Sequence, residues 1–226
     1  MRRLVIPELL DTDSGSPEEV AASLRDLRRV NRWFGGISTM RRLVERVAQA
    51  SGKTTLSLLD VACASGDVPL QLQQQFASDS LTLNVTLLDR AATHLPRMQR
   101  AVVGDALALP FPGGAFDVVT CSLFVHHLEP NEIKVFANEA LRVCRIAFVI
   151  NDLVRSRVHH VLTHLALPMF RSRLTRHDAR VSVQRSYTPG ELRSMLAEAV
   201  ADRIEITRFF LYRMGVIVWK RDLNGL

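Results

Sequence analysis

The segment Leu56-Ser57-Leu58-Leu59-Asp60-Val61-Ala62-Cys63-Ala64-Ser65-Gly66-Asp67 carries the strongest structural signal in the chain. It begins as a short apolar run, which has the length of a buried strand, and continues into small residues. Such a turn lets backbone amides approach a ligand closely. Residues 68–76 then have the pattern of a helix. A buried strand that leads through a small-residue turn into a helix is typical of a parallel α/β sheet.

The rest of the chain continues this alternation. Further strands are expected at 83–88, 101–103, 116–121, 146–150, 204–210 and 214–220, with helices at 131–144 and 189–200. Continuous apolar strands indicate a sheet that is covered on both faces. We therefore predict an α/β fold: a Rossmann-like, doubly wound, seven-stranded sheet that is mostly parallel with an antiparallel closing strand.

Helices are also expected on both flanks of this core. Ser16-Pro17-Glu18-Glu19 is a capping box with proline at the first helical position, and a second helix is expected at 39–50. Residues 152–186 are predicted to be a helical insertion, because a structureless connection of that length is improbable in a compact domain. We expect one domain over 1–226, divided into an N-terminal helical lid (1–50), a cofactor-binding core (51–151), an acceptor cap (152–186) and a closing helix and strands (187–226).

Composition narrows the class of protein. The 226 residues are 47% hydrophobic and 23% charged, as in globular proteins, and no apolar run is long enough for a membrane helix. The N-terminus lacks a signal-peptide core, and the three cysteines suit neither a disulfide framework nor a zinc knuckle. A cytoplasmic protein is expected. The net charge of +6 includes arginines gathered in 155–185, which form either a face with local ion pairs or a surface for an acidic partner. The oligomeric state is not indicated.

Polar residues follow several of the expected strands. In open parallel sheets, ligands bind outside the carboxyl ends of the strands, where the strand order reverses. Asp89 ends the second strand and is placed to hold a ribose diol. Gly104-Asp105-Ala106 follows the third strand, and Cys121-Ser122 ends the fourth.

These residues resemble the class I S-adenosylmethionine-dependent methyltransferases over about residues 30–150. Leu109-Pro110-Phe111-Pro112-Gly113-Gly114-Ala115-Phe116-Asp117 is similar to a family signature, and 124–128 to its strand-to-helix segment. The resemblance implies S-adenosyl-L-methionine as cofactor, with a glycine loop under its amino-acid end, Asp89 on the ribose and Asp105 on the adenine amino group. The cofactor-binding residues that it implies are Asp60, Ala62, Cys63, Ala64, Gly66, Asp89, Arg90, Gly104, Asp105, Ala106, Cys121 and Ser122.

One departure from the family pattern concerns the loop itself. Ala62 and Ala64 stand where the family has its first two glycines. Alanine disfavours positive φ, so the loop either uses ordinary dihedral angles or is strained.

Two other cofactor readings fit less well. A dinucleotide site needs Gly-x-Gly-x-x-Gly, and this turn has only Gly66. Gly52-Lys53-Thr54 imitates the end of a phosphate loop, but it precedes a strand and lacks the leading glycine.

Histidines are the candidate catalytic bases for a weakly acidic acceptor. We favour His177, whose neighbour Asp178 can orient an imidazole, and His126, which follows the fourth strand. His160 and His164 lie one helical turn apart, but without a carboxylate nearby they predict no metal site. The amphipathic stretch 158–170 suggests an apolar roof and hence a hydrophobic acceptor.

The chain as a whole is similar to bacterial methyltransferases found beside type III polyketide synthases. That similarity implies O-methylation of a small phenolic or polyketide-derived acceptor. One alternative is a nucleic-acid methyltransferase, which is disfavoured because Cys121-Ser122-Leu123-Phe124 lacks the Asn/Asp-Pro-Pro-Tyr segment. The other is a non-catalytic scaffold that kept the methyltransferase fold.

Overall fold

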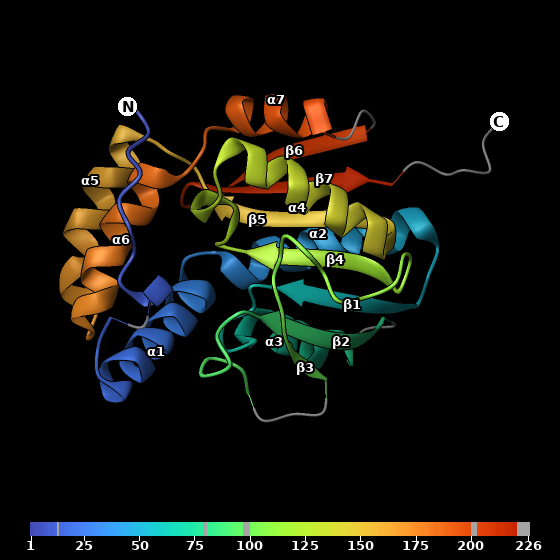
Figure 1. Cartoon of the computed structure of the whole chain (residues 1–226), viewed down its shortest axis with the longest axis horizontal. Helices are drawn as coiled ribbons and strands as arrows, with labels where there is room; N and C mark the ends of the chain where they lie inside the picture. The colour runs from blue at the N-terminus through green and yellow to red at the C-terminus, as the bar shows by residue number, and fades with distance from the viewer. Residues whose placement is uncertain (13, 79–80, 97–99, 200–202, 221–226) are drawn as a thin grey trace.

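A seven-stranded sheet forms the centre of the protein in the computed structural model, which describes residues 1–12, 14–78, 81–96, 100–199 and 203–220 (Figure 1). The strand order is β3-β2-β1-β4-β5-β7-β6. The strands are β1 (Thr55–Val61), β2 (Thr82–Asp89), β3 (Ala101–Val103), β4 (Phe116–Ser122), β5 (Cys144–Leu153), β6 (Arg203–Phe209) and β7 (Arg213–Trp219).

The pairing pattern places the reversal of strand order at β1. Strands β1 to β5 pair in parallel, whereas β7 runs antiparallel to both β5 and β6. β1 lies between β2 and β4, so the chain winds outward in both directions from this strand. This strand order and pairing confirm the predicted fold. Ligands of doubly wound sheets bind where the strand order reverses, so a site is expected at the carboxyl end of β1.

Helices cover both faces of the sheet, as continuous apolar strands require. Helices α2 (Gly36–Ser51) and α3 (Asp67–Phe76) pack on one face, in a core that includes the fully buried Met40, Val44 and Leu72. Helices α4 (Pro130–Val143) and α7 (Pro189–Ala199) pack on the other, around Phe136 and Phe148.

A third group of helices lies beyond the carboxyl ends of the parallel strands, to the left in Figure 1. It comprises α1 (Pro17–Trp33), α5 (Arg157–Ala166), α6 (Arg173–Arg185) and the short turns η1 (Leu10–Thr12), η2 (Val125–His127) and η3 (Leu167–Met169). The predicted capping box at Ser16 and Glu19 begins α1. Ser23 of α1 and Thr175 of α6 share a buried hydrogen bond of 3.0 Å, so the two helices are locked together.

Most element boundaries agree with the sequence to within one residue, and those of α2 and β5 differ. β5 begins at Cys144, two residues before the expected 146, so that Cys144 belongs to the strand and not to the end of the expected helix 131–144. α2 begins at Gly36 instead of residue 39, because Gly35 takes a left-handed conformation (φ 78°) that starts the new helix at once. β5 extends three residues past the expected end at 150, to Leu153, since Asn151 and Asp152 are buried polar side chains that the apolar pattern does not register. Helices are present within 152–186, as expected. The expected end of the last helix at 200 lies outside the described residues.

Among the described helices, none has the length and apolar character needed to cross a membrane.

Candidate functional site

A cavity of about 680 Å³ opens at the carboxyl ends of β1, β2 and β4. Its walls come from these strand ends and from α1, α5, α6 and the segment before α1. Its size falls within the range of roughly 300–1,000 Å³ usual for small-molecule sites. The predicted residues that line it are Asp60, Ala62, Cys63, Ala64, Asp89, Arg90, Gly104, Asp105, Ala106, Ser122 and His126.

The loop after β1 adopts a strained backbone. Ala62 has φ 54° and Ala64 has φ 48°, both in the left-handed region. Of the two options left by the sequence, the loop therefore keeps the glycine-type dihedral angles and accepts a cost of about 1–2 kcal/mol at each alanine. Gly66 has φ 66°, and a Cβ there would lie 2.6 Å from Leu87 Cδ1. Gly66 shapes the loop without lining the cavity.

Two acids from neighbouring strands face the cavity on the β2 and β3 side. Asp89 Oδ2 accepts a hydrogen bond from Ala64 N at 2.7 Å, and its Oδ1 accepts one from Ala91 N at 2.9 Å. Asp105 Oδ1 accepts from Leu107 N at 2.9 Å. Backbone donors thus fix both carboxylates at the cavity wall, and further lone pairs of their oxygens are left for a ligand.

Asp60 lies deeper, at the end of β1. Thr120 Oγ1 donates a hydrogen bond to its Oδ1 over 2.5 Å. Burial raises the pKa of Asp60 to about 7; the Thr120 bond opposes this, and the charges of Asp67 and Asp89 add to it. Asp60 is therefore poised to change its charge near neutral pH.

Arg213 is a cavity residue that the sequence did not reveal. Its side chain is buried, and it donates to Phe34 O at 3.2 Å through Nε and to Asn31 Oδ1 at 3.3 Å through Nη2. Nη1 is buried with no hydrogen-bond partner among the described residues. Burial lowers the pKa of Arg213 to about 10, so it remains a cation that has a free donor at the cavity.

His126 is held from two sides by carboxylates. Its Nδ1 donates to Asp152 Oδ1 over 2.7 Å, and its Nε2 lies 3.4 Å from Glu8 Oε1. Burial alone lowers the pKa of His126, but Asp152 and Glu8 outweigh this and raise it to about 10. His126 therefore holds its proton at neutral pH, which does not suit the predicted role of a free base.

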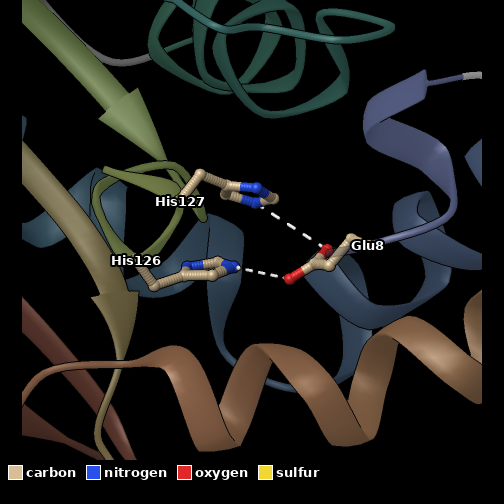
Figure 2. A group of neighbouring side chains, drawn as sticks. All are labelled: Glu8, His126 and His127. Carbon is tan, nitrogen blue, oxygen red and sulfur yellow. Dashed lines mark ion pairs between the residues drawn. The ribbon is translucent and has the colours of Figure 1, made fainter. Parts of the chain in front are cut away.

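Glu8 and His127 complete a group with His126 (Figure 2). Both imidazoles point toward the Glu8 carboxylate, which comes from the segment before α1. Burial raises the pKa of Glu8, but His127, His126 and the Ser182 hydroxyl together lower it below its usual value. The carboxylate is thus ionised. No sequence signal pointed to Glu8, because its contacts are with residues distant in the chain.

Some predicted residues lie elsewhere. The side chain of His177, the other expected base, does not line the cavity; its Nδ1 is bonded to Asp178 Oδ1 at 2.9 Å on the same helix. Cys121 is fully buried beneath the cavity floor and does not line it either. The roof of the cavity is partly apolar, as the pattern of 158–170 indicated, with Leu162, Ala166 and Phe170 among its residues.

Comparisons with known proteins agree with this geometry. The sequence model described as "Methyltransferase domain" matches residues 59–147. Ajmaline N-methyltransferase from Rauvolfia serpentina is 30% identical over 118 residues, which cover 49% of this chain. The match covers 39% of that curated relative's length.

Solved structures share the fold over nearly the whole chain. The plantazolicin methyltransferase BpumL, in complex with a triazolic desmethylPZN analog and SAH, has a TM-score of 0.70 at 13% identity and 95% coverage of both chains. A SAM-dependent methyltransferase from Aquifex aeolicus has a TM-score of 0.61 at 14% identity, covering 91% of this chain and 98% of that one. The chain has the fold of these methyltransferases, and residues 59–147 match the methyltransferase-domain model.

Proposed function

We propose that this chain transfers a methyl group from S-adenosylmethionine to an oxygen of a small, apolar, phenolic or polyketide-derived acceptor. One observation carries the proposal: a single cavity holds the acids of β2 and β3 on one side of β1 and the Glu8, His126 and His127 group on the other. The cofactor, when bound, supplies a methyl group activated on a sulfonium. The remaining work, which is to bind, orient and exclude water, belongs to the residues of this chain.

The β2 and β3 side fits the cofactor. Asp89 is positioned to receive the ribose hydroxyls and Asp105 the adenine amino group, as the family resemblance implies. On the other side of β1, Ser122 Oγ of β4 and Arg213 Nη1 of β7 are buried polar atoms without hydrogen-bond partners among the described residues. We assign Arg213 Nη1 to the methionyl carboxylate, since a guanidinium is a matched donor for that group.

The β4 and β5 side fits an acceptor. Leu27, Val30 and Leu162 give the cavity apolar walls, and Phe170 and Val183 extend them. The Glu8 carboxylate and the His126 imidazolium form its polar end. A phenolic hydroxyl at this position donates its hydrogen bond to Glu8, which takes up the proton as the oxygen is methylated, while the positive charge of His126 stabilises the developing oxyanion.

The arginines of 155–185 do not favour the nucleic-acid alternative. Arg155 donates to Ser186 O and pairs with Glu191, and Arg173 pairs with Glu19. Arg185 pairs with Asp11. Much of this cluster thus holds the cap to the rest of the chain, in agreement with the ion-pair interpretation.

Mass spectrometry tests the proposal. The protein is incubated with S-adenosylmethionine and a panel of phenols, matched anilines and thiols, and products are scored for the mass gain of one methylene. Methylated phenols support the proposed reaction, whereas products from anilines alone would assign nitrogen as the acceptor atom. Calorimetric binding of S-adenosylhomocysteine without any product would favour the scaffold alternative.

A further inference from the structure

We propose that Glu8, His126 and His127 bind one divalent metal ion of the zinc class, with a coordination position open to the acceptor cavity. The inference deepens the proposed function, on which it rests for the identity of the acceptor side. The open position would take an oxygen donor of the acceptor.

The three side chains already have the spacing of a metal site. His126 Nε2 lies 3.4 Å from Glu8 Oε1, and His127 Nε2 lies 3.8 Å from Glu8 Oε2 (Figure 2). One ligand atom from each residue falls within 4.8 Å of the others. Ligands about 2.0–2.1 Å from a tetrahedral zinc ion are roughly 3.3 Å apart. The two measured separations exceed this value by at most about 0.5 Å, and the 4.8 Å limit on the whole group means that the remaining contact can require a larger contraction.

Each imidazole is also hydrogen-bonded, through its Nδ1, to a second carboxylate. His126 Nδ1 is bonded to Asp152 Oδ1 at 2.7 Å, and His127 Nδ1 to Asp11 Oδ2 at 3.1 Å. Metal-binding histidines almost always donate their other ring nitrogen to such a partner, which fixes the tautomer and orients the ring. In both histidines this arrangement directs Nε2 toward the Glu8 carboxylate.

An unsatisfied atom points into the same place. His126 is 2% exposed, and its Nε2 has only the ion pair with Glu8 Oε1 at 3.4 Å and no well-formed hydrogen bond among the described residues. A buried polar atom of this kind needs a partner, and an ion seated between Nε2 and the carboxylate supplies one. Metal binding would replace the proton otherwise held on His126, and the charge of the ion would then take over the role that the imidazolium has toward the acceptor oxygen in the proposed function.

The donor set selects the class of ion. Two imidazoles and one carboxylate suit zinc, cobalt, nickel or iron, whereas magnesium and calcium prefer oxygen ligands throughout. Three protein ligands with one open position are the arrangement of catalytic zinc sites. All three residues line the cavity, so a bound ion would be in contact with it.

The test uses the full chain after treatment with a chelator. Co²⁺ is titrated while visible absorption is recorded, and Zn²⁺ binding is measured by calorimetry. We expect one ion per chain and a cobalt spectrum without thiolate charge transfer, since no cysteine belongs to the group of Glu8, His126 and His127. Glu8→Gln and His127→Gln should each weaken Zn²⁺ binding by about 100-fold, and Asp11→Asn by about 10-fold, with unchanged circular dichroism.

His164→Gln is the matched control. His164 forms the other close histidine pair, with His160, and its Nδ1 is bonded to the carbonyl of its own helix. The control should bind metal as the wild type does. Absence of stoichiometric binding, or binding lost in His164→Gln and kept in Glu8→Gln, overturns the proposal. Binding of S-adenosylhomocysteine to the chelator-treated wild type tests the proposed function separately, so the two failures are distinguishable.

Discussion

Asp152 and His126 form a buried ion pair in which the imidazolium donates to the carboxylate over 2.7 Å, and the backbone N–H of His126 donates to the second oxygen of Asp152 at 3.1 Å. The pair joins the end of β5 to the turn that follows β4. One carboxylate thus sets both the position and the charge of the imidazole at the cavity.

Asp152→Asn should lower the free energy of unfolding by roughly 3–5 kcal/mol, because it leaves a buried charge without its partner. Urea denaturation at neutral pH measures this loss. Glu198→Gln removes the exposed pair with Lys134 and should cost less than about 1 kcal/mol. Equal losses of unfolding free energy in Asp152→Asn and Glu198→Gln would contradict a larger contribution from the buried pair of Asp152 and His126.

Asp89→Asn should weaken the binding of S-adenosylhomocysteine about 10- to 100-fold, since a charged acceptor for two ribose hydroxyls becomes a neutral one. Calorimetry measures the change, and circular dichroism checks that the loop is intact. Asp105→Asn should have a smaller effect, because we assign it one adenine contact. An unchanged affinity of Asp89→Asn for S-adenosylhomocysteine would contradict the assignment of the ribose to Asp89 at the end of β2.

Arg213→Lys should weaken the binding of S-adenosylhomocysteine by about 10-fold, because a lysine cannot reproduce the fork of donors. Methylthioadenosine has no amino-acid part and should bind this variant as it binds the wild type. The ratio of the two affinities, measured by calorimetry, therefore isolates the carboxylate contact. A parallel loss for both ligands would show a general disturbance of the cavity instead.

Asp60 should make the stability of the ligand-free protein fall as pH rises. Its pKa is raised from 3.8 to about 7, so between these values the folded state keeps a proton that the unfolded state has released. The free energy of unfolding then decreases from pH 4 to pH 7, by up to about 4 kcal/mol, and the loss is complete above pH 7. Urea denaturation at pH 5 and pH 8 should show a smaller difference in Asp60→Asn than in the wild type.

Ala64→Gly should stabilise the protein by about 0.5–1 kcal/mol, and raise Tm by roughly 1–4 °C, because glycine takes φ 48° without strain. Gly66→Ala should do the opposite, since its Cβ would meet Leu87 and its φ is also positive. Differential scanning calorimetry compares both. A destabilised Ala64→Gly would mean that the alanine side chain contributes packing that outweighs its strain.

The fold was predictable because apolar runs and turn residues are local signals. The strands from β1 to β5 are predominantly apolar segments, and the capping box at Ser16 marks the start of a helix without help from tertiary contacts. The pattern ended β5 too early, at 150, because buried Asn151 and Asp152 obtain their partners from the tertiary structure.

The cavity wall was predictable where it is built from strand ends, as with Asp89 and Asp105. Glu8 and Arg213 were missed because only the folded chain brings them to the cavity. His177 was favoured for its neighbour Asp178, yet adjacent residues on a helix need not face the same space. The assigned roles of all these residues remain predictions for the experiments above.

One wall of the cavity is made by strand ends and the other largely by helices outside the sheet. This difference bears on how the acceptor specificity of such a protein can change. The side that we propose for the nucleoside is built from strand ends of the central sheet, whereas much of the opposite wall comes from α1, α5 and α6 outside it. Exchange of residues 157–185 between homologues would therefore alter which compounds are accepted and leave the donor pocket undisturbed. The architecture lends itself to modular engineering of new alkylation catalysts.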